Sequence, residues 1–127
     1  MESSLEEAFV QKRICLMALL GSLVFVGCGS GQSTNDLIED LKSSEEGDRI
    51  KAVRLVQLRK GDASKVVPAL IESLQDQQAD IRWSAAIGLG HFGAEAESGL
   101  TALEKAQRDP DARVREAARV AISRIGH

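Results

Sequence analysis

The sequence is poor in the residue types that build most active sites. Tyrosine is absent, phenylalanine occurs three times, tryptophan once, and cysteine and histidine twice each. No Cys or His pair has metal-ligand spacing, no glycine-rich phosphate loop follows a strand, and no serine stands in a nucleophile elbow. We therefore predict that the protein is not an enzyme and binds no cofactor or metal ion.

The chain also lacks a strong charge imbalance. It has 16 basic and 19 acidic residues and a formal net charge of −3. A nucleic-acid partner would require a concentrated basic face, so none is expected. Hydrophobic residues make up 43% of the chain although aromatic residues are scarce. A core of alanine, leucine, isoleucine and valine favours closely packed helices.

Long apolar runs are missing except near the N-terminus. Lys12 and Arg13 precede an uncharged, mostly apolar run from Ile14 to Val26. The run is too short to span a bilayer comfortably as a permanent helix. A positive pair followed by a short apolar run is typical of a secretory signal peptide.

The residues after this run point to a lipid anchor. Residues 24–29, Val-Phe-Val-Gly-Cys-Gly, resemble a bacterial lipobox, in which a small residue such as Gly27 precedes the cysteine. The resemblance implies that residues 1–27 are a lipoprotein-type signal peptide. It also implies that Cys28 is lipidated and is the first residue of the mature protein, so that the protein meets the membrane through its N-terminal lipid.

Small polar residues follow, and residues 28–35 are expected to form a flexible tether. By resemblance to the sorting rule of lipoproteins, Gly29 after the cysteine implies sorting to the outer membrane if the source is a diderm bacterium. The expected location is the cell envelope, with the domain lipid-anchored at the outer membrane or facing the periplasm. Two alternatives remain open: an uncleaved anchor, or an ordinary signal peptide in which Cys28 is incidental.

The rest of the chain, residues 36–127, is a repeat with a period of 33 residues. The segment Ile81–Gly93 returns as Val114–Gly126 with its small and apolar positions kept, and an earlier copy precedes both. A fixed period of this length is typical of stacked helical units. Apolar residues at i, i+3, i+4 and i+7 predict about six helices. The expected second helices of the pairs contain 37–43, 70–76 and 103–109, and the expected first helices cover 45–59, 79–91 and 111–125.

Polar residues mark the predicted helix starts. Ser43 and Glu46 have the spacing of a capping box, Asp62 is expected to cap a helix over 63–75, and Asp109 is expected to cap the helix that begins near Pro110.

Within the helices, Gly88 and Gly90 would each cost about 1 kcal/mol relative to alanine, so close backbone packing is the expected compensation. Leu58 is expected to take a core position in the first copy, because Arg59 stands where the later copies have Phe92 and Ile125.

The pattern resembles HEAT repeats, most closely the short HEAT-like repeats named after phycobilisome lyases. The resemblance is carried by Ala69–Asp76, Ile81–Gly90 and Asp109 with Val114–Ala118. It implies an all-α fold, a short right-handed α-solenoid of helical pairs. It also implies a scaffold or assembly module that binds a protein. The alternative is an enzyme accessory or a chromophore lyase-like subunit.

Three arginines recur at the repeat period: Arg49, Arg82 and Arg115. Six residues before them stand Ser43, Asp76 and Asp109. In HEAT-like arrays such a ladder of acids and arginines ties neighbouring repeats together. The alternative is a row that binds anions.

Several residues are candidates for binding a partner. Trp83 takes the position of Ile50 and Glu116, so we expect it to be partly exposed, either as an anchor for a partner or as a half-buried ring packed along its own helix. His91 is expected to be a solvated residue at a helix end. The second helices should line the inner face of the array, with candidate contacts at Glu39, Lys42, Glu72, Gln75, Glu104, Lys105 and Arg108.

The last repeat is expected to be incomplete. It ends after the first helix of its pair, with no second helix to cover Val114, Ala118 and Ile122. We therefore predict self-association or partner docking at the C-terminal end. Taken together, the sequence predicts a membrane-anchored lipoprotein that presents a helical scaffold to a protein partner.

Overall fold

The computed structural model describes residues 31–126, and the predicted signal peptide and Cys28 lie outside this range. The described residues form helices and no strand, so the all-α prediction is confirmed. None of these helices is long and apolar enough to cross a membrane. The α-helices are α2 (Thr34–Asp40), α3 (Glu46–Val56), α4 (Ala63–Ser73), α5 (Ala79–Phe92), α6 (Leu100–Ala106) and α7 (Ala112–Ile125), with short 3₁₀ helices η3 (Lys60–Asp62) and η4 (Gly93–Gly99).

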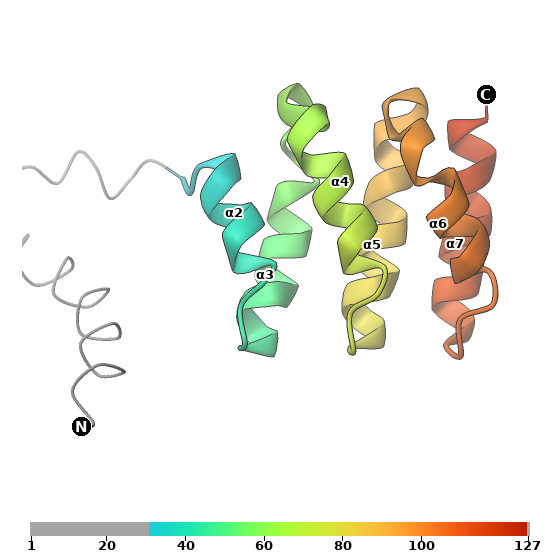
Figure 1. The fold of residues 1–127 in the computed structure, drawn as a ribbon, viewed down its shortest axis with the longest axis horizontal. Coiled ribbons are helices and arrows are strands. Elements are labelled where there is room, and N and C mark those ends of the chain that lie inside the picture. The colour runs from blue at the N-terminus through green and yellow to red at the C-terminus, as the bar shows by residue number, and fades with distance from the viewer. Residues whose placement is uncertain (1–30, 127) are drawn as a thin grey trace, which may run out of the picture. The chain divides into compact units, whose positions relative to one another are not determined.

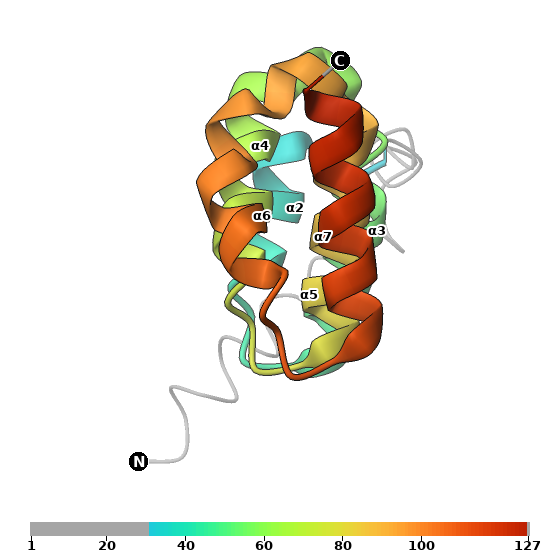
Figure 2. The same ribbon diagram turned by 90° about the vertical axis from the view of Figure 1, so that its right-hand side faces the viewer.

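The helices stack in two layers. One layer contains α2, α4 and α6, and the other contains α3, α5 and α7 (Figure 1). Each helix packs on its pair partner in the opposite layer. Helix α5 also packs on α3 and on α7 in its own layer, and α4 packs on α2 and on η4. Figure 2 looks along the stack and shows α6 and α7 facing each other as the last pair.

The observed pairing corrects the predicted grouping. The pairs are α2 with α3, α4 with α5, and α6 with α7, because each of the helices α2, α4 and α6 packs mainly on the helix that follows it. The third pair is therefore complete. Val114 and Ala118 are fully buried and Ile122 is half-buried, so the prediction that α7 leaves these residues uncovered is wrong.

The core lies between the two layers and follows the repeat. Leu37, Leu70 and Leu103 occupy equivalent positions and are at most 1% exposed, and Ile81 and Val114 face them from the other layer with the same burial. Burying one such side chain fully contributes about 1.5–3 kcal/mol. Each pair thus hides its apolar face against its neighbours, which is why the 33-residue period persists.

The helix starts differ from the predicted ones. A capping box forms at α2, where the Ser33 hydroxyl accepts from the Asp36 N–H at 3.2 Å and the Asp36 carboxylate accepts from the Ser33 N–H at 3.0 Å. The predicted box at Ser43 and Glu46 is wrong, because α3 begins at Glu46 itself. The Ser43 hydroxyl instead accepts from the Glu45 N–H at 3.1 Å, within the loop before α3.

Two other predicted caps are also used differently. Asp62 precedes α4, but its carboxylate accepts from the Thr34 hydroxyl and not from the start of α4. Asp109 does not cap α7; Asp111 does, accepting from the Arg113 N–H at 2.8 Å. In both cases the carboxylate binds a residue distant in the chain, and Asp109 also accepts from the Asp111 N–H in the loop before α7 at 2.9 Å.

Leu58 is not a core residue. Helix α3 ends at Val56, three residues earlier than expected, and the Leu58 side chain in the following turn is 75% exposed. After this early end of α3, the chain turns through η3 into α4. Gly88 and Gly90, in contrast, are both buried in α5, as their expected close packing requires.

Candidate functional site

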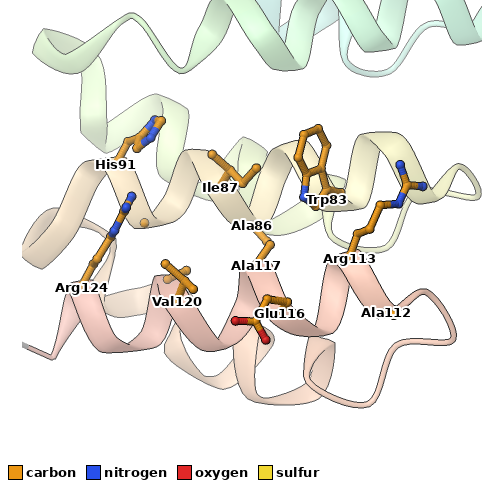
Figure 3. Close-up of a pocket in the computed structure, with 12 residues that line it drawn as sticks. Trp83, Ala86, Ile87, His91, Ala112, Arg113, Glu116, Ala117, Val120 and Arg124 are labelled. Atoms are coloured by element: carbon orange, nitrogen blue, oxygen red, sulfur yellow. The ribbon is translucent and has the colours of Figure 1, made fainter.

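An apolar groove runs between α5 and α7 on the outer side of their layer (Figure 3). Its volume is about 580 Å³. Small residues, including Ala86, Ala117 and Ala121, form its floor, and larger side chains form its walls. The lining residues are Trp83, Ala86, Ile87, Gly90, His91, Ala112, Arg113, Glu116, Ala117, Val120, Ala121 and Arg124.

In the groove, α5 carries glycine at the position where α3 carries glutamine. Gln57 precedes Gly90 by one repeat and lies between α3 and α5. Its amide donates to the Val53 carbonyl at 2.7 Å and to the Ser84 carbonyl of α5 at 3.0 Å. At Gly90 there is no side chain to cross the equivalent space between α5 and α7.

The glycines also set how closely the helices approach. A Cβ added at Gly90 would lie 3.1 Å from the Ala121 Cα, so α7 backbone occupies the space beside it. A Cβ added at Gly88 would lie 2.7 Å from the Gln57 Cγ, so at this position a side chain fills the space instead. At α3/α5 the Gln57 side chain therefore fills the space between the helices. At α5/α7 the backbones of the two helices approach each other directly, and the groove lies outside this contact.

Trp83 forms one end of the groove and is half-buried. The Arg113 guanidinium carbon lies 6.0 Å from the centroid of the indole ring, within range of a cation–π contact. Ion pairs to Asp80 at 2.9 Å and to Asp111 at 3.0 Å hold Arg113 in place. The side-chain hydrogen bonds from Arg113 lower the pKa of the Asp111 carboxyl.

The other end of the groove is polar and basic. Figure 3 shows His91 and Arg124 projecting there, with Ile87 and Val120 between them and Trp83. Both polar side chains are exposed, in agreement with the solvated helix-end position expected for His91. Among the described residues, Arg124 has no carboxylate within 4.0 Å.

The predicted inner-face residues lie away from this groove, in or next to the α2, α4 and α6 layer, and are exposed. Gln75 and Lys105 line a second hollow of about 600 Å³ between α4 and α6, together with Leu74 and Thr101. This hollow is more polar than the α5/α7 groove. The structure does not bring Trp83 together with any of the residues Glu39, Lys42, Glu72, Gln75, Glu104, Lys105 and Arg108.

The recurring arginines link each pair to the next. The Arg82 Nε and Nη2 donate to the two carboxylate oxygens of Asp109 at 2.8 and 3.0 Å. Arg49 makes the same contact with Asp76, at 2.9 and 3.4 Å. In both, Nη1 donates to two backbone carbonyls of the loop before its own helix. The fork of the guanidinium thus spans two loops at once.

Burial and pairing act in opposite directions on Asp109. Burial alone would raise the pKa of its carboxyl, but the hydrogen bonds from Arg82 and from the Asp111 N–H hold the pKa below its ordinary value. The same hydrogen bond to Asp109 raises the pKa of the Arg82 guanidinium. Both groups therefore stay charged at neutral pH, as bidentate pairing requires.

The family model for HEAT repeats matches residues 34–123. The chain belongs to the HEAT-repeat family. HEAT repeats indicate a protein-binding helical scaffold, and the two-layer stack of this HEAT-repeat chain has that form. Comparison with curated protein sequences gives no match.

The groove itself escaped sequence reasoning, although Trp83 was found. The sequence feature that could have indicated the groove is Gly90, which stands one repeat after Gln57. This difference can be interpreted only once it is known which helices face each other.

Within residues 31–126, no three His, Cys, Asp or Glu side chains come together in a way that could hold a metal ion. Nothing in the groove resembles an acid–base pair, since its only carboxylate, Glu116, pairs with Arg119 at 3.2 Å.

Proposed function

We propose that this HEAT-repeat protein is a lipid-anchored scaffold that holds an amphipathic helix of a partner protein in the α5/α7 groove. The observation that carries the proposal is the open apolar groove next to Trp83, at a position where the preceding interface is filled by Gln57. We assign no catalytic step to the protein.

The lining of the groove supports a helical occupant. Trp83, Ile87 and Val120 offer apolar surface along one direction of the groove, so residues at i, i+3, i+4 and i+7 of a partner helix could contact them in turn. The end at Arg124 lacks a carboxylate partner within the described residues. An acidic residue on the partner helix would form an ion pair with Arg124. The half-buried Trp83 would supply the main apolar contact.

The lipid anchor is the second part of the proposal and depends on Cys28. Acyl chains on this cysteine would bury enough methylene groups to hold the domain at a membrane surface. The residues between Cys28 and the start of α2 at Thr34 would be the spacer. We propose that the protein lies in the cell envelope, lipid-anchored at the outer membrane or facing the periplasm. There the scaffold would recruit its partner to the membrane.

Site-specific photo-crosslinking of the full chain in its native envelope tests the groove. A photoreactive amino acid at Val120, which lies in the groove and is 39% exposed, should give one discrete adduct. The matched control is Leu58, which is 75% exposed but outside the groove, and it should not give this adduct. The adduct should disappear when Trp83→Ala is added. The same adduct from both positions, or an adduct that survives Trp83→Ala, would refute the groove as the binding site.

Metabolic labelling with a fatty-acid analogue tests the anchor. The wild-type chain and Cys15→Ala should carry the label and partition with the membrane fraction, whereas Cys28→Ala should lose both properties. Because Cys15 lies inside the predicted signal peptide, it is the matched control for loss of a thiol. Labelling that persists in Cys28→Ala would refute the anchor without bearing on the groove.

A further inference from the structure

The arginine ladder has one member that lacks a carboxylate in the described part of the chain. Arg115 is held like Arg49 and Arg82: its Nη1 donates to the carbonyls of Asp109 and Pro110 at 2.7 and 3.0 Å. In the two earlier arginines, Nε and Nη2 then bind an aspartate of the next loop. No carboxylate lies within 4.0 Å of Arg115 in residues 31–126.

The side chain of Arg115 is therefore positioned before any ligand arrives. Arg115 is half-buried as a residue, and two backbone carbonyls fix its guanidinium, so little side-chain freedom remains to be lost on binding. The free edge, Nε and Nη2, is the edge that binds a carboxylate with two parallel hydrogen bonds elsewhere in the ladder.

We propose that the free edge of Arg115 is a binding site for a side-chain carboxylate of a partner protein. The site is separate from the α5/α7 groove, and it stands whether or not a helix binds there. An Asp or Glu at the start of a helix or in a loop of the partner would take the place that Asp109 takes at Arg82.

A second copy of this chain does not fit the site when stacked in the repeat register. The residue that would meet Arg115 is Ser43, which stands at the position of Asp76 and Asp109. Ser43 keeps the local role of these aspartates, because its hydroxyl accepts from the N–H two residues later, as Asp109 does from Asp111. It has no carboxylate to offer an arginine.

The neighbouring surface of α7 also disfavours repeat-like stacking. Arg119 stands where α5 has Ala86, a fully buried residue that faces α7. Arg119 is exposed and forms an ion pair with Glu116 at 3.2 Å. A contact made through one carboxylate and a polar surround therefore fits this face better than a further apolar helix layer, which favours a different protein as the partner.

The test is a titration of the full chain followed by NMR of the arginine Nε–Hε groups. The probe is N-acetyl-aspartate methylamide, with N-acetyl-asparagine methylamide as the neutral control. We expect the Arg115 signal, assigned by its loss in Arg115→Lys, to shift saturably with the aspartate probe and not with the asparagine probe. Arg49 and Arg82, which are already paired, should not shift.

Arg54 is the matched control, because it is an exposed arginine outside the ladder. If Arg115 and Arg54 shift alike, Arg115 is an ordinary surface arginine and the proposal fails. It also fails if the Arg115 Hε already resonates with that of Arg82 in the free chain, since the edge is then occupied. Self-association of the wild-type chain that Arg115→Lys abolishes would make a second copy the occupant and overturn the proposal as stated.

Discussion

The interfaces α3/α5 and α5/α7 are built from equivalent positions of the repeat, but their outer surfaces differ. At α3/α5 the Gln57 side chain crosses between the helices and binds the Ser84 carbonyl. At α5/α7 the equivalent residue is Gly90, and an apolar groove remains. The positions that the repeat preserves, such as Leu37, Leu70 and Leu103, build the stack. The candidate binding surface lies where the residue in one repeat differs from its equivalent in the preceding repeat, as Gly90 differs from Gln57.

The arginine links show the same contrast. Both links use a bidentate geometry, but the longer hydrogen bond of Arg82 to Asp109 is 3.0 Å and that of Arg49 to Asp76 is 3.4 Å. The interface with the open groove thus has the tighter link.

The largest effect is expected from removing the charge of Asp109. Asp109→Asn leaves the Arg82 guanidinium, 16% exposed, without its charge partner and should lower the free energy of unfolding by about 3 kcal/mol. Asp76→Asn should cost less, because its second hydrogen bond to Arg49 is longer. Urea unfolding of the full chain measures both losses.

Asp80→Asn is the control, because its ion pair with Arg113 is 56% exposed. It should change the free energy of unfolding by less than about 0.5 kcal/mol. Equal losses in the Asp109 and Asp76 variants would remove the contrast between the two links.

The same pair predicts an acid dependence of stability. Because folding lowers the pKa of Asp109, its contribution is fully present above the ordinary Asp pKa of about 3.9 and is lost as the pH falls through the lower folded value. Wild-type stability should therefore fall from about pH 4 downward, and the fall should be shallower in Asp109→Asn. Urea unfolding between neutral pH and acid gives both slopes. Parallel curves would mean that Asp109 titrates as an ordinary carboxyl.

The third prediction concerns how each interface is closed. Gly88→Ala places a Cβ 2.7 Å from the Gln57 Cγ, so Gln57 must move and lose its carbonyl contacts. After a gain of about 1 kcal/mol in helix propensity, the net cost should be about 1 kcal/mol. Adding Gln57→Ala should relieve most of the clash.

Gly90→Ala is the matched control for this cycle. Its new Cβ meets the Ala121 backbone at 3.1 Å, so Gln57→Ala should not relieve it, and the two changes should add. A double-mutant cycle on the full chain by urea unfolding separates the cases. The same coupling energy for both glycines would show that the two interfaces are closed in the same way.

The stack was predictable because its signals are repeated. The 33-residue period and the buried leucines recur along the chain, so the all-α class and the stack of repeated helices follow from the sequence. The pairing of successive helices was not predictable, because periodicity places helices without saying which neighbour each one faces. That uncertainty produced the wrong expectation of an uncovered α7.

The predictions of the helix caps were wrong for a different physical reason. Asp62 and Asp109 have the sequence positions of caps, but their carboxylates bind Thr34 and Arg82, which are distant in the chain. Such partners cannot be read from local spacing, because they come close only when the helices stack. The α5/α7 groove was missed on similar grounds, since a single Gly90 in place of Gln57 has meaning only once α5 and α7 lie side by side.

The last prediction concerns the end of the groove with Trp83, where the expected effect on stability is small. Arg113 is 56% exposed, so Arg113→Ala should change the free energy of unfolding by less than about 1 kcal/mol. Its effect on the indole should be clear, because the guanidinium lies over the ring at 6.0 Å. Trp83 is the single tryptophan, so its fluorescence reports this groove alone.

Removing Arg113 should raise the rate constant for acrylamide quenching of Trp83 and shift its emission to longer wavelength. Asp80→Asn, which removes one of the two ion pairs holding Arg113, should give a smaller change in the same direction. Arg54→Ala, on the α3 side of the filled interface, should give none. Unchanged quenching in Arg113→Ala would mean that the indole is shielded by α5 and α7 themselves. The tryptophan end of the groove would then resemble the closed α3/α5 interface, and the difference between the two interfaces would be confined to Gly90 and the Arg124 end.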